Sequence, residues 1–290
     1  MKKIGLIGMG LVGKAFIKRF MAANYQVIGY DINQEAANAA RKVGVVVGNS
    51  PANIAKQCEL IFLSLPNSNI VNQVIWGENG LAEFCSHNST IIDTTTSDPQ
   101  ETIQHYQRLK LQKIRFIDCP LVGSSQEISE VKGISLVGDI EAKAVDYIPL
   151  LKTFSKKIFF LGEIGQGHQT KLVVNLVLGL NRIVLSESLG LAKKCGMDLF
   201  QILEILKSSA AYSEVMDTQG EIMLKQSFEN PVARLAQHAK DVGLILKLAA
   251  EKEARVPLSE LHDCLLKEAI KSNWGALDNS AVINLFIPPN

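Results

Sequence analysis

A glycine-rich turn between an apolar strand and a helix is the feature that most constrains how this chain can fold. The turn follows the apolar run Lys3–Ile7 and precedes the helix-forming segment Lys14–Phe20. In that order, Gly8 permits a tight turn, Gly10 lets backbone amides approach a pyrophosphate, and Gly13 brings the helix against the strand. The spacing therefore predicts a dinucleotide-binding loop made of Gly8, Met9, Gly10, Leu11, Val12 and Gly13.

An aspartate at the end of the next predicted strand supports this interpretation. Asp31 follows Gln26–Tyr30, about 20 residues after the loop, where a carboxylate accepts hydrogen bonds from the adenosine ribose hydroxyls. Asp31 would also repel a 2′-phosphate, and residues 32–35 contain no arginine, so NAD is favoured over NADP. Two alternatives stay open at this point: a glycine turn that binds no ligand, and a fold that binds S-adenosylmethionine, which usually lacks the full glycine spacing.

The order of strand-like and helix-like segments predicts the fold class. In the first half, short β-branched runs alternate with helical patterns, which is typical of an α/β Rossmann domain with a doubly wound parallel sheet. From Gly165 onward, apolar residues recur only at helical spacing, which predicts an all-helical C-terminal domain. The expected strands are Lys3–Ile7, Gln26–Tyr30, Leu60–Ser64, Thr90–Asp93, Arg115–Asp118 and Ile158–Leu161, and the expected helices of the second half are Lys171–Cys195, Leu199–Leu206, Arg234–Ala250 and Leu258–Ile270.

Length and glycine positions suggest where the domains meet. A chain of 290 residues exceeds the size at which one core usually stops growing. Gly162 and Gly165 interrupt the pattern just before a long helix. We therefore predict an NAD-binding Rossmann domain at residues 1–163 and an all-helical substrate and oligomerisation domain at residues 164–290, linked by a long interdomain helix. The active site is expected in the cleft between them.

Composition and charge argue against several classes of partner. The chain has 30 basic and 29 acidic residues and no polybasic tract, so nucleic acid is not expected as a partner. The five cysteines show neither a disulfide framework nor metal-ligand spacing, which indicates reduced thiols, a cytoplasmic location and no metal site. The most apolar stretch, Leu172–Leu191, carries Arg182 and Glu187, so we expect a helix buried between domains and no membrane association.

The start of that long helix carries two polar residues suited to catalysis. Lys171 and Asn175 lie one turn apart on the same helix face, where both could touch one substrate. Apolar neighbours and a nicotinamide cation would disfavour the ammonium form and lower the pKa of Lys171 towards the range useful for acid–base chemistry. The alternative is a lysine that reaches solvent from a buried helix, with Asn175 satisfying a loop carbonyl.

Five ordered motifs give the chain a resemblance to a known family. Beyond the glycine loop, they are Leu65-Pro66-Asn67, the segment Asp93–Pro99, the segment Asp118–Gly123, the Lys171 segment, and Lys240-Asp241 with Leu244 behind it. Through nearly its whole length the chain resembles the β-hydroxyacid dehydrogenases. That family includes 3-hydroxyisobutyrate dehydrogenases, tartronate semialdehyde reductases and the more distant 6-phosphogluconate dehydrogenases.

The resemblance implies further contacts with the cofactor. Leu65 and Pro66 would lie along its adenosine half. Thr95 and Thr96 would lie near the nicotinamide, and Lys240 would close over the cofactor and the substrate.

The resemblance also implies an activity: hydride transfer between NAD and a small β-hydroxy acid such as 3-hydroxyisobutyrate. Lys171 would be the general acid/base, and Asn175 would hold the substrate oxygen. The same residues suit a reductase of small aldehyde acids such as succinic semialdehyde, glyoxylate or tartronate semialdehyde. A dinucleotide-binding module without catalysis is the alternative from another class.

The substrate loop departs from the family pattern. The family usually has Asp-Ala-Pro-Val-Ser-Gly-Gly, whose serine hydroxyl and glycine amides grip a carboxylate, whereas this chain has Val122, Gly123 and Ser124 at the substrate-binding positions. Val174 likewise stands where the family often has an asparagine. The resemblance therefore leaves the identity of the acid open.

The long apolar helix and the small helical domain also bear on assembly. An apolar face of this kind is expected to be shared with another copy of the chain, as a homodimer or homotetramer.

Overall fold

The computed structural model describes residues 2–289, which belong to two compact units. The first unit ends at Lys171 and the second begins at Leu172. The sequence-based division after residue 163 stays a prediction; in the structure, residues 164–171 belong to the first unit.

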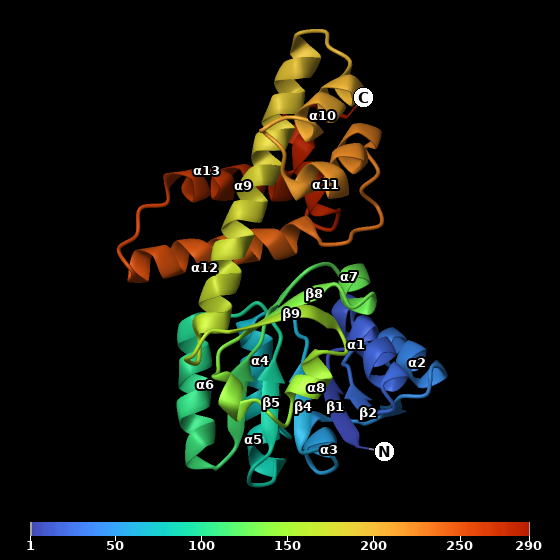
Figure 1. Ribbon diagram of the computed structural model, residues 1–290, viewed down its shortest axis with the longest axis vertical. Helices are drawn as coiled ribbons and strands as arrows, with labels where there is room; N and C mark the ends of the chain where they lie inside the picture. The colour runs from blue at the N-terminus through green and yellow to red at the C-terminus, as the bar shows by residue number, and fades with distance from the viewer. Residues whose placement is uncertain (1, 290) are drawn as a thin grey trace. The chain divides into compact units, whose positions relative to one another are not determined.

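A six-stranded parallel sheet organises the first unit (Figure 1). Its strand order is β3-β2-β1-β4-β5-β6, the order of a doubly wound dinucleotide-binding sheet. The predicted Rossmann fold is thereby confirmed, although the short β3 was not expected. The strands are β1 (Lys3–Ile7), β2 (Gln26–Tyr30), β3 (Val46–Val47), β4 (Leu60–Leu63), β5 (Thr90–Asp93) and β6 (Arg115–Asp118).

Most helices that cover this sheet begin with a capping side chain. Asn33, Ser50, Asn67 and Asp98 each accept a hydrogen bond from a backbone N–H of the helix that follows. The helix after β1 is different, because its N-cap residue Gly10 has no side chain to accept such a bond. The helices are α1 (Leu11–Ala22), α2 (Gln34–Lys42), α3 (Pro51–Ala55), α4 (Ser68–Trp76), α5 (Leu81–Phe84) and α6 (Pro99–Leu111).

A second, three-stranded sheet completes the first unit. It contains β7 (Leu121–Val122), β8 (Gly133–Val137) and β9 (Ser155–Phe160), with α7 (Ser125–Ser129), the 3-10 turn η1 (Glu141–Lys143) and α8 (Ile148–Leu151) between them. The predicted strand Ile158–Leu161 corresponds to β9 and therefore lies outside the parallel sheet. After the buried Ser155, all its residues are exposed or half-buried, whereas strands buried on both faces are apolar throughout.

The second unit is helical, as predicted; among the described residues its only β feature is an isolated bridge between Arg234 and Asp278. Its elements are α9 (Gln166–Lys194, which begins in the first unit), α10 (Leu199–Lys207), α11 (Glu214–Lys225), α12 (Leu235–Glu251), α13 (Pro257–Lys271) and the 3-10 segment η2 (Asn279–Leu285). The sequence did not predict α11, whose centre holds Gly220. A Cβ atom there would stand 2.6 Å from Leu203 Cδ1, so close packing on α10 requires a glycine that weakens the helical pattern.

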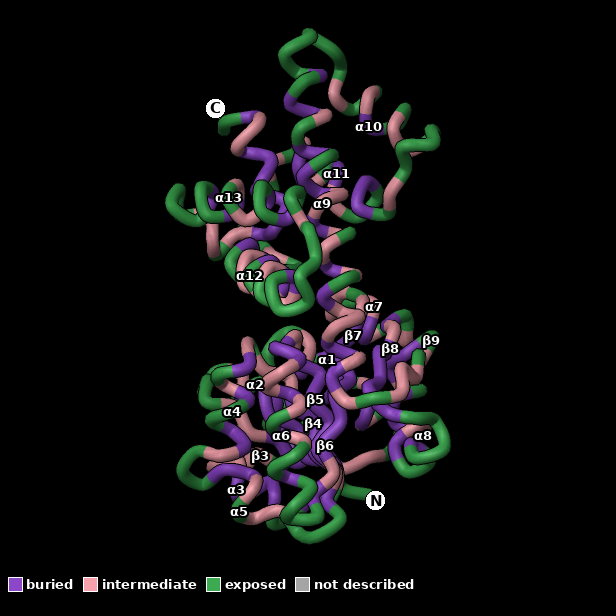
Figure 2. The backbone as a smooth tube through the Cα atoms, turned by 90° about the vertical axis from the view of Figure 1, so that its left-hand side faces the viewer, coloured by how far each residue is buried: buried purple, intermediate pink, exposed green. Residues whose placement is uncertain are grey.

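Helix α9 is long and apolar enough to cross a membrane by length and composition alone, and it is the one such helix among residues 2–289. Leu185 and Leu189 of this helix are fully buried in the core of the second unit. Figure 2 colours parts of α9 as buried. That burial is typical of a core helix, which passes the same length and composition test.

Candidate active site

The three glycines of the loop after β1 serve different purposes. At Gly8, where φ is +93°, a Cβ atom would stand 2.1 Å from the Ser64 carbonyl oxygen, and at Gly13 it would stand 2.2 Å from that of Gly8. Close chain packing therefore requires both glycines. At Gly10, by contrast, a Cβ atom would meet no protein atom within 4 Å. The open space at Gly10, beside the uncapped start of α1, fits a dinucleotide pyrophosphate.

Asp31, which directly follows β2, is hydrogen-bonded to the glycine loop. Its carboxylate accepts hydrogen bonds from the Met9 N–H at 2.6 Å and the Asn33 N–H at 2.8 Å. A pocket beside it is lined by Tyr30, Asp31, Ile32, Gln34, Ala37, Arg41, Val47, Gly48 and Asn49. Arg41 was not predicted as a residue of this pocket, because only residues 32–35 were searched for an arginine. Helical spacing was the available signal, since Gln34, Ala37 and Arg41 follow one face of α2.

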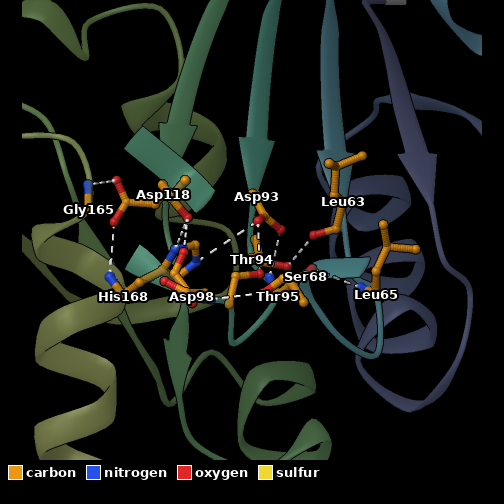
Figure 3. Close-up of polar contacts among 12 residues, drawn as sticks. Leu63, Leu65, Ser68, Asp93, Thr94, Thr95, Asp98, Asp118, Gly165 and His168 are labelled. Atoms are coloured by element: carbon orange, nitrogen blue, oxygen red, sulfur yellow. Dashed lines mark hydrogen bonds and ion pairs between the residues drawn. The ribbon is translucent and has the colours of Figure 1, made fainter. Parts of the chain in front are cut away.

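Hydrogen bonds join the loops that follow β4 and β5 (Figure 3). The Leu65 N–H donates to Thr95 Oγ1 at 3.1 Å, and the Thr95 N–H donates to Asp93 Oδ1 at 3.0 Å. Pro66 and Thr96 follow Leu65 and Thr95 in the chain. The structure thus brings together the two predicted cofactor segments, which lie at the carboxyl edge of the sheet.

The carboxylate of Asp118, at the end of β6, caps the start of α9 (Figure 3). Asp118 Oδ1 accepts from the Gly165 N–H and Oδ2 from the His168 N–H, both at 2.9 Å. Glycines surround this carboxylate: a Cβ atom at Gly138 would stand 2.0 Å from Oδ1, and one at Gly167 would stand 2.7 Å from Oδ2. Asp118 therefore fixes the first turn of the helix that carries Lys171.

His168 extends this network inside the first unit. Its side chain is fully buried; Nδ1 lies 2.8 Å from Thr102 Oγ1, and Nε2 lies 4.0 Å from Asp93 Oδ2. Burial raises the pKa of Asp93, and the nearby His168 opposes that rise. Asp93 and His168 thus connect the Thr95 loop to α9, three residues before Lys171.

In the predicted substrate loop, the backbone N–H of Ser124 is already hydrogen-bonded to the side chain of Glu127 in the helix that follows. Ser124 caps α7; its Oγ accepts from the Glu127 N–H at 3.2 Å, while the Ser124 N–H donates to Glu127 Oε2 at 2.7 Å. Gly123, between Val122 and Ser124, has a φ of +127°, which favours glycine. The amide that a substrate carboxylate would use at Ser124 is therefore already bonded to Glu127, a residue that sequence reasoning did not select.

In the second unit, one aspartate joins two of the predicted site residues. Asn175 Nδ2 donates to Asp241 Oδ2 at 2.9 Å, and Lys240 Nζ lies 2.8 Å from Asp241 Oδ1. Asp241 and Asn175 are both buried. The resemblance marked Lys240-Asp241 as a pair but assigned no role to Asp241, because the importance of the aspartate depends on the neighbouring helix α9.

Among residues 2–289, no three histidine, cysteine, aspartate or glutamate side chains gather in a way that could hold a metal ion.

Comparison with known proteins decides the family. The family profile of the NAD binding domain of 6-phosphogluconate dehydrogenase matches residues 3–162, and that of the NAD-binding region of NADP-dependent 3-hydroxyisobutyrate dehydrogenase matches residues 165–286. The chain belongs to the β-hydroxyacid dehydrogenase family. The resemblance, the oxidoreductase class and the NAD(P) cofactor predicted from sequence are thereby confirmed.

Individual relatives match the chain over nearly their whole length. It is similar to 2-(hydroxymethyl)glutarate dehydrogenase of Eubacterium barkeri, with 28% identity over 98% of this chain and 94% of the relative. It is also similar to glyoxylate/succinic semialdehyde reductase 1 of Arabidopsis thaliana, with 27% identity over 97% of each chain. Its fold matches a 3-hydroxyisobutyrate dehydrogenase from Salmonella typhimurium, with a TM-score of 0.90 and 19% identity over 98% and 100% of the two chains.

Proposed function

We propose that the protein interconverts a small β-hydroxy acid and the corresponding aldehyde or keto acid, with NAD as cofactor and Lys171 as general acid/base. One observation carries this proposal: α9 starts on the carboxylate of Asp118, at the sheet edge where the glycine loop also lies. Lys171 lies in the first part of α9. Because Asp118 fixes the first turn of this helix, the backbone of Lys171 is held near the edge where open α/β sheets bind their ligands.

The chemistry divides between the cofactor and the chain. NAD(P), when bound, supplies the hydride acceptor or donor. Lys171 Nζ, as the free amine, accepts the hydroxyl proton as the C–H bond of the alcohol carbon breaks. In the reverse direction its ammonium form protonates the developing alkoxide. Asn175 would hold the same oxygen, and its hydrogen bond to Asp241 supports this role by fixing the orientation of the amide.

The preference for NAD rests on Asp31. Asp31 lines the pocket beside β2, and a 2′-phosphate there would meet its negative charge. Arg41 lines the same pocket and would offset part of that repulsion. We expect Asp31→Ala to weaken NAD binding and to narrow the gap between NAD and NADP, whereas Asp146→Ala on the surface should change neither. An unchanged ratio of the two dissociation constants would remove Asp31 from the cofactor site.

The substrate is proposed to place its carboxylate at the loop of Val122, Gly123 and Ser124. Because Glu127 already bonds to the Ser124 amide, the carboxylate must displace that side chain or use the neighbouring donors. Relatives that act on hydroxymethylglutarate, glyoxylate and succinic semialdehyde, by their names, support a small acid in either the oxidative or the reductive direction.

We also propose a cytoplasmic location and a working form of two or four copies. The assembly is supported by apolar side chains of α9 that face solvent in the second unit.

The deciding test is turnover with a panel of β-hydroxy acids and their semialdehydes, followed by the absorbance of the reduced nicotinamide. We expect at least one acid to be oxidised with NAD and its aldehyde to be reduced with NADH. Binding of NAD without turnover of any acid or aldehyde would contradict the proposal and favour the non-catalytic dinucleotide-binding module.

A further inference from the structure

Glu127, which is bonded to the predicted substrate loop, has a backbone that the first unit holds in place. Its neighbour Ile128 is fully buried in the core of that unit, and α7 packs against α1. Lys18 Nζ of α1 donates to Ser129 Oγ at 2.9 Å, and the Lys132 N–H donates to the Glu127 carbonyl at 2.7 Å. The fold of the first unit therefore places Glu127 beside the loop.

The side chain of Glu127 is less constrained than its backbone. It is half-buried, and its Oε2 accepts a hydrogen bond from the Ser124 N–H at 2.7 Å. Lys132, the nearest lysine along the chain, forms its ion pair with Glu130, at 2.7 Å. Rotation of the Glu127 side chain towards solvent would therefore free the Ser124 amide while α7 keeps its place.

The loop also lacks one of the donors that the family pattern provides for a carboxylate. Val122 has no hydroxyl where that pattern has a serine. A Cβ atom added to Gly123 would stand 3.6 Å from Glu127 Oε2, so the glutamate carboxylate lies close to the exposed Gly123 as well. An anion that approaches the Ser124 amide therefore meets a like charge that already holds this N–H.

We propose that Glu127 is a specificity-determining residue that competes with the carboxylate of the substrate for the Ser124 N–H. This inference rests on the proposed function, because it takes the loop as the subsite for the acid. A substrate carboxylate must displace Glu127 and exchanges one charge-assisted hydrogen bond for another. An uncharged ester leaves Glu127 in place, because a neutral acceptor forms a hydrogen bond only about half as strong. Glu127 thus weakens the binding of acids and has little effect on their esters.

The kinetic test compares an acid with its ester in three proteins. The substrates are 3-hydroxyisobutyrate and its methyl ester, and the proteins are the wild type, Glu127→Ala and Glu127→Gln. In Glu127→Ala we expect the KM for the acid to fall about fivefold or more, with a much smaller change in kcat, and the KM for the ester to stay within about twofold. Glu127→Gln should fall between the other two, because its amide oxygen keeps the capping box but carries no charge.

A control and a stability measurement separate this role from helix capping. Glu130→Gln removes an exposed carboxylate near the same helix that is bonded to Gln126 and Lys132, and it should leave both KM values unchanged. If Glu127 served only as a cap, Glu127→Ala would lower the melting temperature and leave the ratio of the two KM values as in the wild type. That result would overturn the proposal.

A binding measurement tests the competition without turnover. Isobutyrate, which lacks the reacting hydroxyl, is titrated in the presence of NADH while the amide signal of Ser124 is followed by NMR. We expect that signal to move, and we expect the dissociation constant to fall about fivefold or more in Glu127→Ala. Methyl isobutyrate should not move it.

The two measurements distinguish failure of this inference from failure of the proposed function. An isobutyrate dissociation constant that is the same in the wild type and in Glu127→Ala would overturn the role of Glu127, even if acids are turned over. The expected isobutyrate titration in a protein that turns over no acid or aldehyde would support the competition at Ser124 and refute only the enzymatic activity.

Discussion

Replacement of Asp118 by asparagine perturbs the connection between the parallel sheet and α9. The carboxylate accepts hydrogen bonds from two buried backbone N–H groups, those of Gly165 and His168, and the chain at Gly138 and Gly167 packs closely against it. An asparagine keeps one acceptor oxygen but turns an NH2 group towards the second N–H. One charge-assisted hydrogen bond is lost and one buried donor is left without an acceptor, which costs about 2–4 kcal/mol of unfolding free energy.

The assay for Asp118→Asn combines denaturant unfolding with hydrogen exchange. We expect a lower unfolding midpoint and faster exchange of the Gly165 and His168 amides, with exchange in the centre of the sheet changed much less. The activity should fall mainly in kcat, because Lys171 follows the loosened turn, while cofactor binding at the glycine loop is retained. Asp146→Asn is the control, since Asp146 is an exposed aspartate of the same unit. An unchanged midpoint together with unchanged amide exchange would refute the role given to Asp118.

Three further predictions follow from the geometry. Gly13→Ala should destabilise the first unit because of the backbone oxygen 2.2 Å from its new Cβ, whereas Gly10→Ala should preserve the melting temperature and weaken NAD binding; equal behaviour of the two variants would contradict the separate roles. His105 accepts a hydrogen bond from Trp76 Nε1 through Nδ1, and burial lowers its pKa from 6.5 to about 4, so the neutral ring is the folded form. Its unfolded form binds a proton first as the pH falls, so about 3 kcal/mol of stability should be lost between pH 6.5 and 4. Unfolding measured across that range should show a smaller loss in His105→Gln, and equal losses in the two proteins would count against this explanation. Asp241→Asn should raise the KM for the acid more than it lowers kcat, because the asparagine keeps one acceptor oxygen but loses the charge and the second oxygen that Asn175 and Lys240 share; steady-state kinetics that show unchanged KM values would exclude that coupling.

The local sequence pattern was sufficient to predict most strands of the central sheet and their order along the chain. The apolar runs at β1, β2, β4, β5 and β6 are short, buried and separated by helical segments, so their type and order followed from periodicity. The exceptions have physical reasons. With only two residues, β3 carries no periodic signal, and α11 contains a glycine that its contact with α10 requires.

Long-range contacts explain what the sequence could not reveal about the site. The glycine loop and Asp31 are local motifs, and their spacing was enough to predict them. By contrast, Asp118 acts on amides 47 and 50 residues later, and Asp241 accepts from an asparagine 66 residues earlier. Glu127 was within reach of sequence reasoning, because a serine followed three residues later by a glutamate is a capping box.

The central claim is that Lys171 transfers a proton without holding the cofactor. The most direct measurement compares kcat with the dissociation constant for NADH in the wild type, in Lys171→Ala and in Lys193→Ala, an exposed lysine near the end of the same helix. We predict that Lys171→Ala lowers kcat by about 10²- to 10⁴-fold and leaves NADH binding unchanged, while Lys193→Ala changes neither. A Lys171→Ala variant that keeps its kcat, or that loses NADH binding in proportion to activity, would contradict the account.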